Sequence, residues 1–80
     1  MVMAKTSRAR LLEALHYAER HSAAGATRIE KQRRLIERLE GRGDTTTAAA
    51  ARVLLATMER AQQGHIADCE RIKRLLARSG

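Results

Sequence analysis

The stretch Leu39-Glu40-Gly41-Arg42-Gly43-Asp44-Thr45 interrupts an otherwise helix-forming sequence of 80 residues near its middle. One of its two glycines can adopt the left-handed backbone conformation that ends a helix. Asp44 and Thr45 can then accept hydrogen bonds from the free N–H groups of the next helix and cap its first turn. A connection this short predicts that the two helices beside it are antiparallel neighbours.

A heptad pattern of apolar and small residues runs through both halves of the chain. From residue 11 the spacing alternates between four and three, which is typical of a coiled-coil seam. In the first half the seam consists of Leu11, Leu15, Ala18, Ser22, Gly25, Ile29, Gln32, Ile36 and Leu39. In the second half it consists of Ala48, Ala51, Leu55, Met58, Gln62, His65, Cys69, Ile72 and Leu76.

The sequence therefore predicts an all-α fold of two long antiparallel helices, a helical hairpin of the coiled-coil type. Residues 1–80 form a single helical-hairpin domain in this interpretation. The first helix covers about 7–40, the turn 41–44 and the second helix about 45–78.

The middle of the predicted seam is small or polar. Ala18, Ser22 and Gly25 leave room where the opposite helix offers Gln62 and His65. Equal distances from the turn place Ser22 opposite His65. We therefore expect Ser22, Gln62 and His65 to form a polar layer, with His65 hydrogen-bonded to Ser22 or Gln62, that fixes the register of the helices.

Two glycines lie inside the predicted helices. Gly25 and Gly64 each cost about 1 kcal/mol relative to alanine at a helical position. Either close packing of a neighbouring residue or a local bend of the helix could be the reason, and we expect close packing at both positions.

Further apolar residues flank the seam and cannot be covered by a lone hairpin. An 80-residue chain with one cysteine has neither a large core nor an intrachain disulfide to supply the missing stability. We therefore expect a homodimer that packs two hairpins into a four-helix bundle, or a protein partner, on this surface. Its candidate residues are Leu12, Leu35, Leu54, Ile66 and Leu75, with Val53 nearby. The alternative is a monomeric hairpin with scattered exposed leucines.

No residue pattern predicts catalysis, a metal or a cofactor. His65 and Cys69 are one helical turn apart and His21 is expected near them, but a closed zinc site takes four ligands. Asp68 shares the face of His65 only partly, and a two-helix unit offers no deep pocket, so we do not expect an enzyme. The segment Gly41-Arg42-Gly43 lacks the following Lys-Ser/Thr of a phosphate-binding loop.

The net charge of +7 favours an anionic partner. Folding the hairpin brings residues 1–15 beside 70–80, where basic residues predominate. The candidates for phosphate binding at this open end are Arg8, Arg10, Arg71, Lys73, Arg74 and Arg78. With a single aromatic residue to stack on bases, these residues support only non-specific binding of nucleic acid. A second basic cluster at residues 31–34 is expected to be neutralised by the pairs Glu30–Arg34 and Arg33–Glu37.

No apolar run approaches the ~20 residues that span a bilayer, and the first residues do not form a secretory signal peptide. A cytoplasmic location is therefore expected, with an organellar transit sequence as the alternative interpretation of the basic start. A peripheral membrane role is disfavoured because the apolar residues are needed for helix pairing.

Several short motifs in residues 21–76 match a known pattern. They read His21-x3-Gly25-x3-Ile29-x2-Gln32-x2-Leu35-Ile36-x2-Leu39, Gly43-Asp44-Thr45, Leu54-Leu55-x2-Met58-Glu59 and His65-x2-Asp68-x2-Arg71. This pattern resembles a group of short hypothetical helical-hairpin proteins of alphaproteobacteria that have no assigned activity. The resemblance implies a hairpin fold and a bacterial origin, but no mechanism. Cys69 departs from the pattern, which has a charged residue there.

The sequence thus predicts a non-catalytic helical interaction or structural protein that acts as a homodimer and needs no cofactor. The alternative is a small basic protein that binds nucleic-acid phosphates non-specifically. The salt dependence of binding distinguishes these two functions, because phosphate binding weakens steeply as the salt concentration rises.

Overall fold

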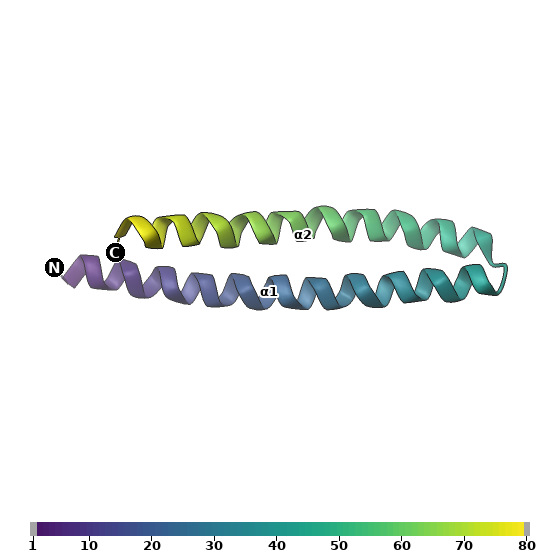
Figure 1. Cartoon of the computed structure of the whole chain (residues 1–80), viewed down its shortest axis with the longest axis horizontal. Helices are drawn as coiled ribbons and strands as arrows, with labels where there is room; N and C mark the ends of the chain where they lie inside the picture. The colour runs from purple at the N-terminus through teal and green to yellow at the C-terminus, as the bar shows by residue number, and fades with distance from the viewer. Residues whose placement is uncertain (1, 80) are drawn as a thin grey trace.

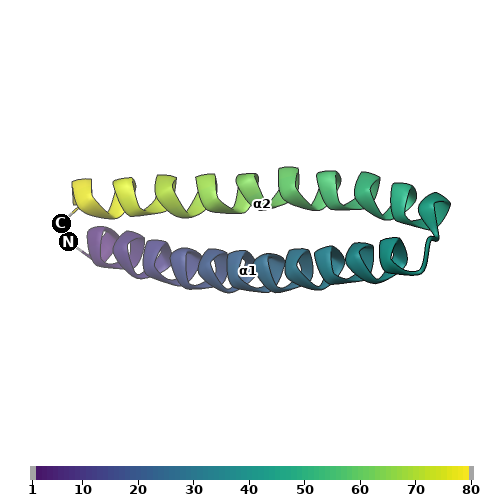
Figure 2. The same ribbon diagram turned by 45° about the vertical axis from the view of Figure 1, so that its right-hand side comes forward.

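Two long helices lie side by side and form an antiparallel hairpin (Figures 1 and 2). This computed structural model describes residues 2–79, with side chains from residue 7 onward; Met1 and Gly80 lie outside the described residues. Helix α1 spans Val2–Gly41 and helix α2 spans Thr45–Ser79. The rod measures 63 × 14 × 14 Å, with the turn at one end and both chain ends at the other (Figure 1). The predicted all-α hairpin is confirmed.

Helix α1 begins at Val2, five residues earlier than the start at residue 7 that the sequence predicted. Residues 2–6 contain neither glycine nor proline, so nothing in this segment ends the helix. No helix within residues 2–79 is both long enough and apolar enough to cross a membrane.

The turn is closed by hydrogen bonds that satisfy both helix ends. Gly43 has a φ of 76°, and its N–H donates to Glu40 O at 3.0 Å. The N–H of Asp44 donates to Leu39 O at 2.9 Å. These two bonds form a Schellman motif, which satisfies carbonyl groups at the end of α1. Asp44 Oδ1 accepts a hydrogen bond from the N–H of Thr47 at 3.2 Å and caps the start of α2.

The seam predicted from the heptad pattern is the interface between the helices. Every one of its residues is buried or half-buried. The buried apolar residues are Ile29, Ile36, Leu39, Ala48, Ala51 and Cys69. Four of these, Ile36, Leu39, Ala48 and Ala51, form a cluster next to the turn, and Leu35 and Leu55 pack against it. The tightest apolar packing therefore lies where the turn holds the helices together.

We predict opposite effects for alanine at the two glycines of the turn. Gly43→Ala should lower the free energy of unfolding by about 1–2 kcal/mol, because a side chain disfavours the left-handed backbone. Gly41→Ala is the matched control: Gly41 is helical, with nothing within 4 Å of an added Cβ, so this change should raise stability by up to about 1 kcal/mol. Urea unfolding followed by circular dichroism at one protein concentration measures both, and equal effects would contradict the assignment of Gly43 as the helix-ending residue.

Candidate functional site

Gln62 is the centre of a polar layer inside the seam. Its Nε2 donates to Ser22 O at 2.8 Å and to Ser22 Oγ at 3.2 Å. Its Oε1 is the buried side-chain atom that lacks a hydrogen-bond partner among the described residues. This oxygen lies where a Cβ on Gly25 would be, so only glycine leaves room for the amide. The predicted packing of a small residue against a large one is present here.

His65 does not take the place in this layer that the sequence predicted. Ser22 is hydrogen-bonded to Gln62, and within residues 7–79 no hydrogen bond joins His65 to either of them. The His65 ring is instead 5.8 Å from the His21 ring, whose other neighbour is the Tyr17 ring at 4.3 Å between centroids. Gln62 takes the hydrogen bond to Ser22 that was predicted for His65, because Gly25 leaves room for the Gln62 side chain to extend along the seam to Ser22.

The residues considered as metal ligands do not converge. Cys69 is buried as a free thiol, and His65 is half-buried. Among the residues that the structure describes, no group of three or more His, Cys, Asp or Glu side chains could hold a metal ion.

Two flanks of the hairpin become distinct once each residue is placed around its helix. With the seam as heptad positions a and d, positions e and b of both helices lie on one side of the rod, and c and g lie on the other. Arg33 pairs with Glu59 at 2.9 Å and Arg52 pairs with Glu40, and all four residues occupy e positions. Surface hollows that involve residues of both helices at c and g positions run along the opposite side.

The e and b positions form a flank that we call the acidic flank. Its three described basic residues are all paired with glutamates of the same flank, since Lys73 lies 3.9 Å from Glu70 in addition to the two pairs between the helices. Three further glutamates add negative charge. The charged residues described on this flank are Glu19, Glu30, Glu37, Glu40, Glu59, Glu70, Arg33, Arg52 and Lys73.

The c and g positions form a flank that we call the basic flank. It carries one acid, Asp68, which pairs with Arg71 at 2.6 Å. Within residues 7–79, this is the only ion pair made by a basic residue of the flank. Its basic residues, all exposed, are Arg10, Arg28, Lys31, Arg38, Arg71 and Arg78. The charge of the chain is therefore separated around the rod as well as along it.

The structure divides the predicted interface residues between the two flanks. Leu12 and Ile66 occupy e positions on the acidic flank, and both are about half exposed. Leu54 and Leu75 occupy g positions on the basic flank and are exposed, whereas Leu35 is half-buried against the core. These five residues do not form one surface. A residue next to the seam can occupy an e position or a g position, and these positions lie on opposite flanks of the rod.

The predicted phosphate-binding residues are also divided. Arg10, Arg71 and Arg78 share the basic flank, while Lys73 is on the acidic flank and Arg74 points outward from α2. Arg8 continues the seam, and its Nη1 donates to Leu76 O at 3.3 Å and Ser79 Oγ at 3.4 Å. Arg8 thus donates hydrogen bonds to the last turn of α2, where a cation and its N–H donors stabilise the helix end.

Arg28 and Arg38 are basic residues of this flank that the sequence interpretation missed, and Lys31 was assigned to a neutralised cluster. The cluster at residues 31–34 was expected to be neutralised, and the pair Glu30–Arg34 is present at 3.5 Å. Arg33, however, pairs with Glu59 of α2 instead of Glu37. The heptad positions of Arg28, Lys31 and Arg38, at c and g, were the signal that could have identified them.

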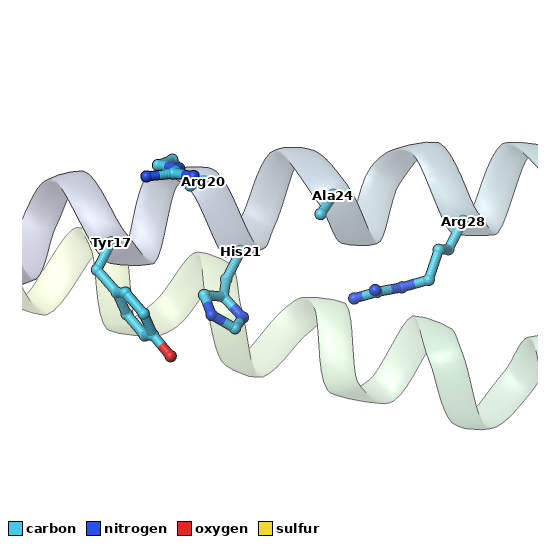
Figure 3. A pocket seen from close by; sticks show the side chains of 5 residues that line it. All are labelled: Tyr17, Arg20, His21, Ala24 and Arg28. Carbon is cyan, nitrogen blue, oxygen red and sulfur yellow. The ribbon is translucent and has the colours of Figure 1, made fainter.

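A shallow hollow lies on the basic flank and is lined by Tyr17, Arg20, His21, Ala24 and Arg28 (Figure 3). The rings of Tyr17 and His21 project toward α2, and the Arg28 guanidinium extends back toward them along α1, with Ala24 between (Figure 3). Arg20 turns to the outer side of α1. No acidic residue lines this hollow.

No family model, curated protein or solved structure matches this chain. The resemblance to alphaproteobacterial helical-hairpin proteins therefore stays a prediction.

We predict that substitution by alanine has different effects on stability at the two mid-helix glycines, because Gly25 is packed against a side chain and Gly64 is not. Gly64 has nothing within 4 Å of an added Cβ, so close packing does not explain it, and Gly64→Ala should raise stability by about 1 kcal/mol. Gly25→Ala should not raise stability, because the new Cβ displaces the Gln62 amide and this loss cancels or exceeds the gain from replacing a helical glycine. In a Gln62→Ala background the gain should return. Thermal or urea unfolding of this double-mutant cycle measures the coupling, and equal gains at both glycines would contradict it.

Proposed function

We propose that this chain is a non-catalytic helical interaction protein that acts as a homodimer, with two hairpins paired through their acidic flanks into a four-helix bundle. The observation that carries the proposal is the exposed surface. A compact monomer of this mass, 8.9 kDa, exposes about 4,800 Å². The hairpin exposes 6158 Å² and has no large side chain that is fully buried among the described residues. Pairing two copies would cover part of this excess.

Charge favours the acidic flank over the basic flank for this contact. Pairing two basic flanks would bring two sets of six cations together with only two acids between them. The acidic flank has a smaller net charge, because its arginines and lysine are matched by glutamates. Repulsion grows with the product of the two charges, so pairing through the basic flank is the more costly arrangement.

The shape of the acidic flank provides a seat for a second copy. A groove in the middle third of the rod is lined by the small residues Ser22, Ala23 and Ala26 on α1 and by Ile66 on α2, together with Glu19, Cys69, Glu70 and Lys73. A two-fold axis across the rod at this level places the Ile66 side chains of both copies together. The whole flank, 63 Å by 14 Å, offers a footprint of roughly 880 Å², close to the ~800 Å² per partner of a standard interface.

We predict that a charge at Ile66 produces monomers. Ile66→Glu adds a carboxylate to an apolar contact beside existing glutamates, so the solution mass should fall from about twice 8.9 kDa to 8.9 kDa. Val53→Glu is the matched control, since Val53 lies on the outer side of α2, is 70% exposed and should leave the dimer unchanged. Sedimentation equilibrium measures the mass, and circular dichroism checks that each variant is helical.

Leu54→Glu distinguishes the two flanks, because Leu54 lies on the basic flank. A dimer that survives Ile66→Glu but is lost with Leu54→Glu would show that the acidic flank is not the interface. A wild-type chain that stays at 8.9 kDa at all concentrations would refute the homodimer itself. A further protein partner and a cytoplasmic location, both expected from the sequence, belong to the same proposal.

A further inference from the structure

We propose that the basic flank binds the phosphate backbone of double-stranded nucleic acid, without sequence preference. This activity goes beyond the pairing of two copies and uses the opposite side of the rod. Six exposed basic residues and one acid line this flank, and they come from both ends and from the middle of the hairpin. An anionic rod lying along the flank would contact several of these residues at once, which is how non-specific binding gains its affinity.

The separation of charge fixes the orientation of the rod on such a partner. The acidic flank repels phosphates, and its Arg33, Arg52 and Lys73 are already paired with glutamates. On the basic flank, Arg28 and Arg38 have no carboxylate partner among the described residues. Their guanidinium groups are free to donate to phosphate oxygens.

The hollow at Arg28 supplies donors for a phosphate group. The Arg28 guanidinium faces the rings of Tyr17 and His21 across Ala24, whose small side chain leaves the space between them open (Figure 3). A guanidinium, a phenol hydroxyl and an imidazole can all donate hydrogen bonds to phosphate oxygens. The absence of an acid from this lining means that an anion meets no like charge there.

A duplex fits this surface better than a single strand or a membrane. Binding of single strands relies on aromatic side chains that stack on bases, and Tyr17 is the only aromatic residue of the chain. A membrane-surface helix needs a continuous apolar face. The exposed leucines of this flank on α2, Leu54 and Leu75, are instead about 30 Å apart at 1.5 Å per residue. A duplex presents a phosphate every ~1.7 Å along its axis, so basic residues at several levels of the rod find partners.

The test compares two double variants that remove the same charge. Arg28→Gln with Arg38→Gln changes the basic flank, and Arg34→Gln with Arg60→Gln changes the outer sides of α1 and α2. Fluorescence anisotropy measures binding of the full chain to a random DNA duplex of about 20 base pairs, as long as the rod, between about 50 and 200 mM salt. The wild type should bind, and its affinity should fall steeply as salt rises. The first variant should bind about tenfold more weakly at low salt and reduce the slope of log K against log salt by about 2. The second should retain the slope of the wild type.

Three results would overturn the proposal. The first is no binding of the duplex by the wild type at about 50 mM salt. The second is an equal loss for both double variants, which would trace binding to net charge and not to the flank. The third is tighter binding to vesicles of anionic phospholipid than to the duplex. Sedimentation of the proteins without DNA tests the homodimer separately. The failure of one proposal can therefore be distinguished from the failure of the other.

Discussion

The register between the two helices depends on the three-residue turn that Gly43 closes. Because Arg42–Asp44 are the only residues between the helices, each level of α1 meets one level of α2. This register places Gly25 under the Gln62 amide. A slip to the next seam position would set Gln62 against Ser22 or Ile29, whose side chains occupy the space that the amide needs. The turn and the Gly25–Gln62 contact therefore specify the same alignment, one through the backbone and the other through shape.

A two-helix unit has a seam where a larger domain has a core, and this limits how much it can bury. Each helix packs on a single neighbour, so the e, b, c and g positions stay in contact with water. Two glutamines, Gln32 and Gln62, occupy the seam and donate hydrogen bonds to backbone carbonyls of the opposite helix. These bonds satisfy the amide nitrogens and favour one register, but they contribute less stability than buried leucines would. Under the proposed pairing of two copies, the stability of the hairpin should depend on protein concentration.

The sequence was sufficient to predict both helices and every residue of the seam, because a period of 3.5 and a glycine-rich break are local signals. The bounds were less exact, since α1 begins five residues before the predicted start and includes Gly41, which was assigned to the turn. It did not show which side chains would meet across the seam. Arg33 has Glu37 within reach on its own helix and Glu59 within reach on the other helix. Only the packing of the two helices shows that Arg33 pairs with Glu59. Two of the three predicted members of the polar layer, Ser22 and Gln62, are hydrogen-bonded to each other, but His65 was assigned the bond that Gln62 makes. The basic residues were grouped by their distance from the open end and not by their position around the helix, so Arg28 and Arg38 were overlooked and Lys73 was included.

The opposite charges of the two flanks also restrict how copies of the hairpin can assemble. A basic flank attracts the acidic flank of another copy, but that contact joins two different surfaces and leaves one of each kind free. Such a contact does not close and would continue into a row of hairpins. It would also occupy the surface proposed for the duplex, so the row and the nucleic acid would compete for the same arginines. Pairing through two acidic flanks closes after two copies and turns both basic flanks outward. The closed dimer is thus the arrangement in which self-association and binding of a polyanion can coexist.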